Sequence, residues 1–209
     1  RQYLHYGGRK IKIITSPVGT SPDLIANLIK SKTVENQIQK IKEGTKKGRK
    51  LILSASRVDY TKGNEELLLA FERLLEKRKD LHGEIVLMMA CVSATSGMKI
   101  YKETQRAIEE IVGRINGKFS LIDWVPIRLS TKRIPYEELV AWFTQADICW
   151  ITPLRDGLSL VAKEYVAARK GKPGVLVLSE FTGASVLLNG AILTNPYSQN
   201  KMDASFNEA

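Results

Sequence analysis

The chain lacks several features that would place it in a class at once. Its 209 residues include only two histidines and two cysteines, widely separated, so no zinc-site spacing is present. No apolar run reaches the roughly 18 residues of a membrane-spanning helix, and the first residues, RQYLHYGGRK, have no apolar core of a signal peptide. Cys91 and Cys149 fall in apolar runs, where buried, reduced thiols are expected. These absences predict a cytoplasmic protein without a metal centre.

Charge is unevenly distributed: the formal net charge is +10. Much of this positive charge lies in one basic run of the sequence. A run of this kind is most often a solvated helix face and loop, and the alternative is contact with nucleic acid or another acidic surface. No aromatic residues interleave with the run and no zinc-finger or RNA-binding motif occurs, so we expect no nucleic-acid partner. The run comprises Lys40, Lys42, Lys46, Lys47, Arg49 and Lys50.

Short apolar runs alternate with helical patterns along nearly the whole chain. This alternation predicts an α/β fold, a Rossmann-like parallel sheet flanked by helices, as one domain over residues 1–209. Ser21 and Pro22 are suited to start a helix that continues, with a break, to about Lys47. The expected strands are 10–15, 51–56, 84–90, 121–125, 147–152, 175–179 and 191–194, and the expected further helices are 65–79, 101–115 (closed by the glycines at 113 and 117), 135–146, 160–170 and, as a short one, 183–188.

One stretch, residues 151–164, combines a strand end, a tight loop and a helix start. The first amides of a helix have no internal partner and attract anions, so Leu160 and Val161 are expected to hold a phosphate, with Ser159 as the N-cap. Glu164, one turn on, and Asp156, in the loop, are placed to accept hydrogen bonds from sugar hydroxyls. The alternative is an ordinary strand–loop–helix unit with a solvated Asp and Glu.

Two cations follow directly after the strand 51–56. Arg57 binds phosphate bidentately, Lys62 acts as a compact charge, and Gly63 lets the backbone turn sharply. Because both lie where strand ends meet the ligand crevice, they are expected to clamp a diphosphate without a metal. Otherwise they are surface cations paired with Asp59 or Glu65.

Four ordered motifs, SRVDYTKG, GRINGKFS, TPLRDGLSLVAKEYVAA and GVLVLSEFTGA, resemble the trehalose-6-phosphate synthase family. The resemblance implies a retaining glycosyltransferase that needs no cofactor and no metal. It also implies that this chain is the C-terminal, nucleotide-sugar lobe of a two-lobed enzyme, so the chain alone is expected to be inactive.

The resemblance further implies roles for matching residues. Arg57, Lys62 and Asp156 would be catalytic, and Arg114 would reach the acceptor phosphate, unless it is only a cation near a helix end. The family usually has Asn at Ser159, which puts the hold of that loop on the sugar in question. The donor would be bound by Arg57, Lys62, Ile134, Asp156, Leu160, Val161, Ala162, Lys163 and Glu164.

The sequence leaves the substrates open. The stretches LVAWFTQADICWITPLRDGL and EIVLMMACVSATSGMK resemble more closely the branch that joins ADP-glucose to glycerol 3-phosphate. The alternative is UDP-glucose with glucose 6-phosphate. A nicotinamide-dependent oxidoreductase is disfavoured because no G-x-G-x-x-G turn is present, and a non-catalytic nucleotide-sugar module stays open. The expected partners are a nucleotide sugar and a phosphorylated acceptor, with no membrane; self-association of the full-length protein is left open.

Overall fold

The computed structural model describes residues 2–14, 16–93 and 98–209. Its centre is a sheet of six parallel strands in the order β5-β4-β3-β6-β7-β8. The chain winds outward from β3 in one direction and then outward from β6 in the other, so the sheet has a switch point between these two strands. The strands are β3 (Lys50–Arg57), β4 (Ile85–Val92), β5 (Ile127–Ser130), β6 (Ile148–Ile151), β7 (Val175–Ser179) and β8 (Ile192–Thr194).

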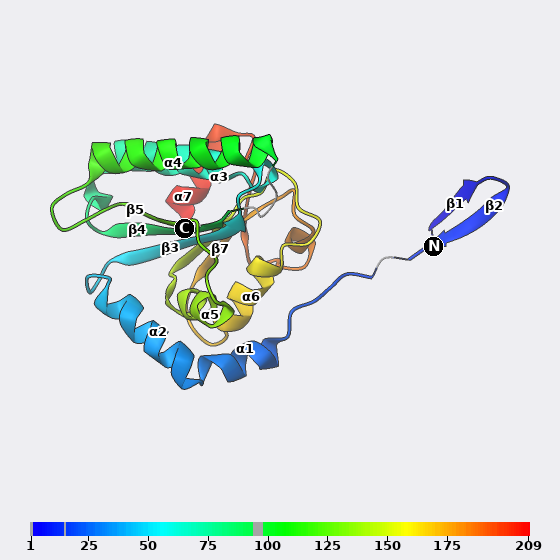
Figure 1. The fold of residues 1–209 in the computed structure, drawn as a ribbon, viewed down its shortest axis with the longest axis horizontal. Coiled ribbons are helices and arrows are strands. Elements are labelled where there is room, and N and C mark those ends of the chain that lie inside the picture. Colours follow the sequence, from blue (N-terminus) through cyan, green and yellow to red (C-terminus); the bar gives the residue numbers. More distant parts are fainter. Residues whose placement is uncertain (1, 15, 94–97) are drawn as a thin grey trace.

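Helices cover both faces of this sheet (Figure 1), which confirms the predicted Rossmann-like α/β fold. One face carries α3 (Asn64–Lys77), α4 (Lys99–Phe119) and α7 (Gln199–Glu208). The other carries α1 (Pro22–Ile29), α2 (Lys32–Glu43), α5 (Tyr136–Gln145) and α6 (Leu160–Ala168). Short 3₁₀ turns are present at Tyr60–Lys62 after β3, at Lys79–Leu81 after α3 and at Gly183–Val186 after β7.

The core forms because strands covered on both faces are almost continuously apolar. Trp150 of β6 is fully buried and stacks on Phe206 of α7, with ring centroids 3.5 Å apart; Phe206 also lies 6.0 Å from Phe71 of α3. Each such buried side chain contributes about 1.5–3 kcal/mol to folding. Cys91 and Cys149 are buried and free, as predicted, and burial raises the pKa of the Cys91 thiol to about 11.

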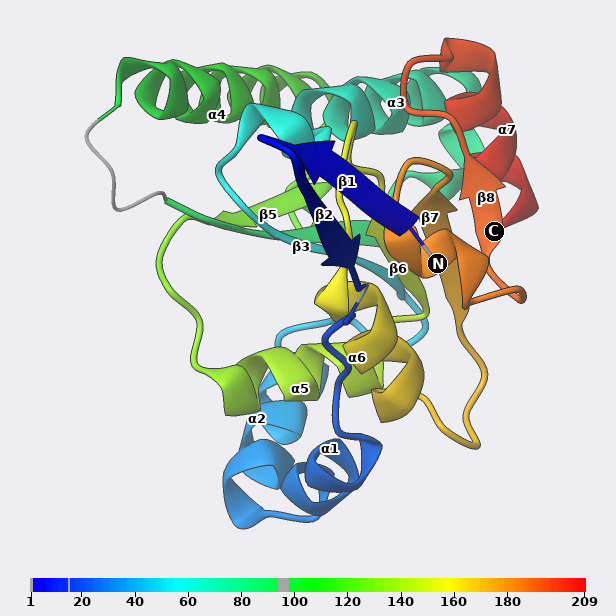
Figure 2. The ribbon, with the colours of Figure 1, turned by 90° about the vertical axis from the view of Figure 1, so that its right-hand side faces the viewer.

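The N-terminal residues form a separate hairpin. β1 (Gln2–Tyr6) pairs antiparallel with β2 (Arg9–Ile13), and both strands are exposed throughout. The hairpin projects away from the body of the molecule in Figure 1, and in the turned view of Figure 2 it lies in front of the body. The strand predicted at residues 10–15 therefore exists in part but does not join the main sheet. Gly7 and Gly8, with φ of +55° and +73°, form the tight hairpin turn that the sequence reading missed.

Two further predictions are corrected around α4. Its two glycines do not close it, since the helix continues to Phe119. The strand predicted at 121–125 is instead a tight turn, in which Leu121 and Trp124 exchange backbone hydrogen bonds of 2.9 and 3.2 Å. The strand begins later, at Ile127, whose amide donates to the Asn116 side chain at 3.0 Å.

The remaining elements follow the predictions closely. Ser21 caps α1 by accepting from the Leu24 amide at 3.4 Å, and the expected break comes at Ser31, which caps α2. The predicted short helix at 183–188 is the 3₁₀ turn Gly183–Val186. The sequence also predicts a long loop containing Ser93–Gly97 after the strand 84–90, and most of this stretch lies outside the described residues.

Candidate functional site

The carboxyl ends of β3 and β6, neighbours in the sheet, open onto a cavity of about 400 Å³. It therefore lies at the switch point, where open α/β sheets bind ligands. The ends of β3 and β4 form one wall, and the loop after β6 with the first turn of α6 forms the other. Its lining comprises Ser54–Arg57, Lys62, Ala90, Val92, Ile134, Leu139, Ile151–Pro153, Asp156 and Leu158–Val161.

The loop after β3 is fixed from both sides. The Asp59 carboxylate accepts from the amide and the hydroxyl of Thr61, at 2.9 and 2.8 Å, and the Thr61 carbonyl accepts from the Leu154 amide at 2.8 Å. Gly63 ends this loop at φ +65°, where a Cβ would overlap the Thr152 carbonyl oxygen. A glycine is therefore required for the β3 and β6 loops to approach each other so closely.

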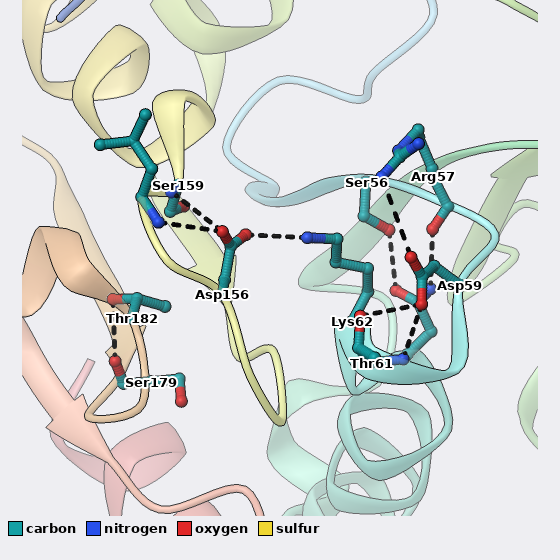
Figure 3. A network of polar contacts seen from close by, with 11 residues as sticks. Ser56, Arg57, Asp59, Thr61, Lys62, Asp156, Ser159, Ser179 and Thr182 are labelled. Carbon is teal, nitrogen blue, oxygen red and sulfur yellow. Dashed lines mark hydrogen bonds and ion pairs between the residues drawn. The ribbon is translucent and has the colours of Figure 1, made fainter. Parts of the chain in front are cut away.

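Lys62 and Asp156 join these two loops across the cavity (Figure 3). The Lys62 ammonium donates to the Asp156 carboxylate at 2.9 Å, and the side chains are only 19% and 21% exposed. Burial by itself raises the pKa of Asp156, but the hydrogen bonds from Lys62 and from the backbone outweigh it, so the pKa lies below its usual value. The alternative, in which these cations are surface residues paired with Asp59 or Glu65, therefore does not hold for Lys62.

Asp156 also organises the start of α6. Its second carboxylate oxygen accepts from the amides of Leu158 and Ser159 at 3.1 and 3.2 Å. Ser159 occupies the N-cap position of α6, as predicted, but it has φ +55°, in the left-handed region, and its side chain makes no capping hydrogen bond. The Asp156 carboxylate fixes this turn instead. Leu160 and Val161, whose amides begin the helix and have no partner within it, line the cavity. The binding of a phosphate by these amides stays a prediction.

The backbone of Asp156 is held by a third loop, which follows β7. The Asp156 amide donates to the Phe181 carbonyl at 3.2 Å, and the Asp156 carbonyl accepts from the Gly183 amide at 3.0 Å. A Cβ at Gly183 would overlap the carbonyl oxygen of Gly157. The sequence reading did not assign this loop to the site, although its GVLVLSEFTGA motif was a signal that could have done so.

Arg57 is the accessible cation of the cavity. Its side chain is 74% exposed, and the nearest carboxylate that pairs with it, that of Asp59, lies 3.9 Å away. Its guanidinium therefore keeps most of its donor capacity for an anion. Ile134 lines the same cavity from the segment before α5, together with the apolar residues Ala55, Val92 and Leu139 that the sequence reading passed over.

The other α6 residues predicted to bind the donor lie beyond the cavity lining. Glu164, one turn along α6, accepts from the Tyr136 hydroxyl at 3.1 Å. Burial and the neighbouring Glu164 charge raise the pKa of Tyr136 to about 12. Ala162 is on the buried face of α6, and Lys163, also in α6, is half-buried.

Arg114 is not brought to this cavity. It lies within α4, where its guanidinium donates to Glu72 of α3 at 2.7 Å, and it is absent from the cavity lining. The structure therefore gives this residue a partner between two helices. Its predicted contact with an acceptor phosphate stays a prediction.

Comparison with known proteins identifies the family. The model of glycosyltransferase family 20 matches residues 1–209. The chain belongs to glycosyltransferase family 20. It is 50% identical to the glucosylglycerol-phosphate synthase of Synechocystis sp. (strain ATCC 27184 / PCC 6803 / Kazusa), with 99% of this chain and 41% of that protein covered. It is 38% identical to the 56 kDa subunit of the UDP-forming α,α-trehalose-phosphate synthase of Saccharomyces cerevisiae, with the same two coverages.

Solved family 20 structures share the fold. The UDP-forming α,α-trehalose-phosphate synthase of Burkholderia xenovorans in complex with glucose-6-phosphate superposes with a TM-score of 0.93 at 38% identity. The alignment covers 99% of this chain and 46% of that one. The chain thus spans less than half the length of these relatives, and its sheet belongs to the GT-B glycosyltransferase fold.

No three His, Cys, Asp or Glu side chains among the described residues gather as a metal site would require. No helix in the described part of the chain combines the length and apolarity needed to cross a bilayer.

Proposed function

We propose that the complete protein transfers glucose from ADP-glucose to glycerol 3-phosphate, with retention at the anomeric carbon and without a metal or cofactor. Two observations support this proposal. The chain is 50% identical to glucosylglycerol-phosphate synthases, and the cations Arg57 and Lys62 line one cavity together with the first residues of α6. The second candidate is trehalose-6-phosphate synthesis from UDP-glucose and glucose 6-phosphate, which the 38% identity to the yeast enzyme supports less well.

In this proposal the donor diphosphate lies between Arg57 and the first turn of α6. The guanidinium supplies bidentate donors, and the amides of Leu160 and Val161 supply the opposite side. Lys62 has three N–H donors, and one of them goes to Asp156, which leaves two for the phosphates. Negative charge that develops on the leaving diphosphate would meet donors that are already positioned, and each can be worth about 2.7–4 kcal/mol.

Asp156 has two tasks in this proposal. Its carboxylate keeps Lys62 and the Ser159 turn in place, and its remaining lone pairs would accept from hydroxyls of the transferred glucose. Because its pKa is lowered, it stays ionised at neutral pH and can accept throughout the reaction. Glu164 would accept from the ribose hydroxyls and Ile134 would lie beside the base.

The deciding experiment is a product assay of the full-length protein with both donors and both acceptors. The proposal requires glucosylglycerol phosphate from ADP-glucose and glycerol 3-phosphate as the dominant product. Dominant formation of trehalose 6-phosphate would replace it with the second candidate.

We infer that the 209-residue chain alone binds donor weakly and has little turnover, because it spans only 41% of the synthases it resembles. Calorimetry with ADP-glucose and a turnover assay on the chain alone test this. Robust catalysis by the chain alone would contradict it.

A further inference from the structure

A second cavity, of about 430 Å³, lies at the opposite end of the sheet from the candidate donor site. It is formed where β3 and β6 begin and is covered by residues 44–49, the segment that joins α2 to β3. Its volume is that of a small-molecule site. The proposed function makes no use of it, nor of the basic run that the sequence concentrates there.

Four cationic side chains line this cavity, and two of them form no ion pair with the part of the chain that the structure describes. Lys46 and Arg49 share Asp123, at 3.4 and 3.3 Å. Lys42 and Lys47 take part in none of the ion pairs found among residues 2–14, 16–93 and 98–209. Positive charge therefore remains uncompensated around the cavity.

The one carboxylate in the lining, that of Asp147, is already engaged. It accepts from the Leu51 amide at 2.9 Å and from the Lys50 ammonium at 3.3 Å. It also fixes the starts of the two strands to each other. Asp147 therefore serves to build the cavity wall and does not offset the free lysines.

The C-terminus of α2 accounts for only part of this charge. Lys40 and Lys42 lie in its last turn, where cations offset the helix dipole. That dipole amounts to about half an elementary charge, whereas Lys46, Lys47 and Arg49 lie beyond the helix end and add to it. The positive charge at this end of the sheet is therefore larger than the charge that would offset the dipole of α2.

The cavity is also lined by buried side-chain groups, both polar and apolar. The Arg49 side chain is only 6% exposed and is held by a 2.6 Å hydrogen bond to the Gly83 carbonyl. The Thr45 hydroxyl oxygen is buried and finds no hydrogen-bond partner in the described part of the chain. Ile41 and Leu51 supply a buried apolar floor.

We propose that this cavity binds a small organic phosphate. Lys42, Lys47 and Arg49 recognise the phosphate group, Thr45 donates to one of its oxygens, and the apolar floor contacts the organic part. A single-stranded nucleic acid would need a groove with aromatic platforms for its bases. None of the residues that line the cavity is aromatic, so a small ligand fits the observations better.

The test is calorimetric titration of the 209-residue chain with adenosine 5′-monophosphate and, separately, with orthophosphate. Both titrations use an Arg57→Ala/Lys62→Ala background, so that the candidate donor site does not contribute. The nucleotide is expected to bind more tightly than orthophosphate. Adding Lys42→Ala and Lys47→Ala should weaken nucleotide binding about tenfold or more, because charge-assisted hydrogen bonds are lost.

The matched control adds Lys102→Ala and Lys201→Ala instead, which removes the same charge from exposed positions on α4 and α7. It should leave the affinity within about twofold, since distant surface charges are largely screened. Thr45→Val tests the interior separately: it should weaken nucleotide binding without lowering the melting temperature, because the hydroxyl has no protein partner to lose.

Four results would overturn the proposal. They are no detectable binding of the nucleotide, equal losses in the cavity variant and its control, equal affinity for nucleotide and orthophosphate, and tight binding of a single-stranded oligonucleotide that the nucleotide does not displace. The last result would assign the basic surface to nucleic acid.

Discussion

At the scale of single residues, the Lys62–Asp156 pair is the contact on which the candidate site depends most. The two residues are 94 positions apart in sequence and meet because β3 and β6 are neighbours. The sequence could predict each residue separately, since each follows a strand directly. It could not predict their pairing, because strand order is a property of the whole sheet.

Lys62→Ala should abolish most activity of the full-length protein. One positioned donor is worth about 2.7–4 kcal/mol in the transition state, so kcat should fall about 10²–10³-fold. Lys50→Ala is the matched control, because it breaks a Lys–Asp pair that is far more exposed, at 66% and 35%, and lies at the other end of β3. Unchanged kcat in Lys62→Ala would contradict the proposed role of Lys62, and the absence of glucosyl transfer in the unsubstituted full-length protein would favour a non-catalytic module.

Asp156 should make stability depend on pH at the acid end. Its folded-state pKa is depressed, so the stabilisation it provides is present above the unfolded pKa of about 3.9 and is lost as pH falls through the folded value. Asp156→Asn should therefore flatten the loss of unfolding free energy below about pH 4. Denaturant unfolding at several pH values measures this, and identical slopes in variant and wild type would contradict it.

The backbone of Ser159 adopts a left-handed conformation that is strained for a serine. A non-glycine residue at φ +55° is strained by about 1–2 kcal/mol. Ser159→Gly should raise the free energy of unfolding by about 0.5–1 kcal/mol, and Ser159→Val should lower it, because a β-branched residue is poorest at this φ. Chemical denaturation of both variants checks the sign, and a stabilised Val variant would show that the turn is not strained.

At the scale of elements, the fold was predictable where strands are buried on both faces, because continuous apolar runs such as 85–90 mark them. The exposed hairpin was predicted only in part, because both of its strands are exposed and show no alternation of buried and exposed residues. The segment 121–125 looked like a strand because it is apolar. Of its four apolar side chains, only that of Trp124 is buried, and its indole donates to the Ile85 carbonyl at 2.7 Å; those of Leu121, Ile122 and Val125 are exposed.

The approach of the β3 and β6 loops gives a test at this scale. Gly63→Ala should lower the free energy of unfolding by about 2 kcal/mol or more, because the left-handed backbone and the overlap with the Thr152 carbonyl both resist a Cβ. Gly171→Ala is matched in φ, at +75°, but meets nothing within 4 Å, so it should cost only about 1 kcal/mol. Equal costs would show that the loops do not approach as closely as described.

At the scale of the whole molecule, one sheet presents two chemically different ends. The carboxyl end holds the candidate donor cavity and the amino end holds the basic one, and β3 and β6 contribute to both. Six of the residues that the family resemblance predicted line the first end, namely Arg57, Lys62, Ile134, Asp156, Leu160 and Val161, whereas Ala162, Lys163, Glu164 and Arg114 do not. The second end could be read from sequence only as a basic run, since a cavity depends on how the segment 44–49 folds over the strand starts.

The central claim is that Arg57, Lys62 and the start of α6 converge on one diphosphate. The most direct measurement is titration of the chain with ADP, followed through the backbone amide NMR signals of Leu160 and Val161. We expect both signals to shift saturably. Arg57→Ala should weaken the binding about tenfold or more, and Arg114→Ala, which removes a cation outside the cavity, should leave it unchanged. Unmoved Leu160 and Val161 signals, or equal effects of the two arginine substitutions, would contradict it.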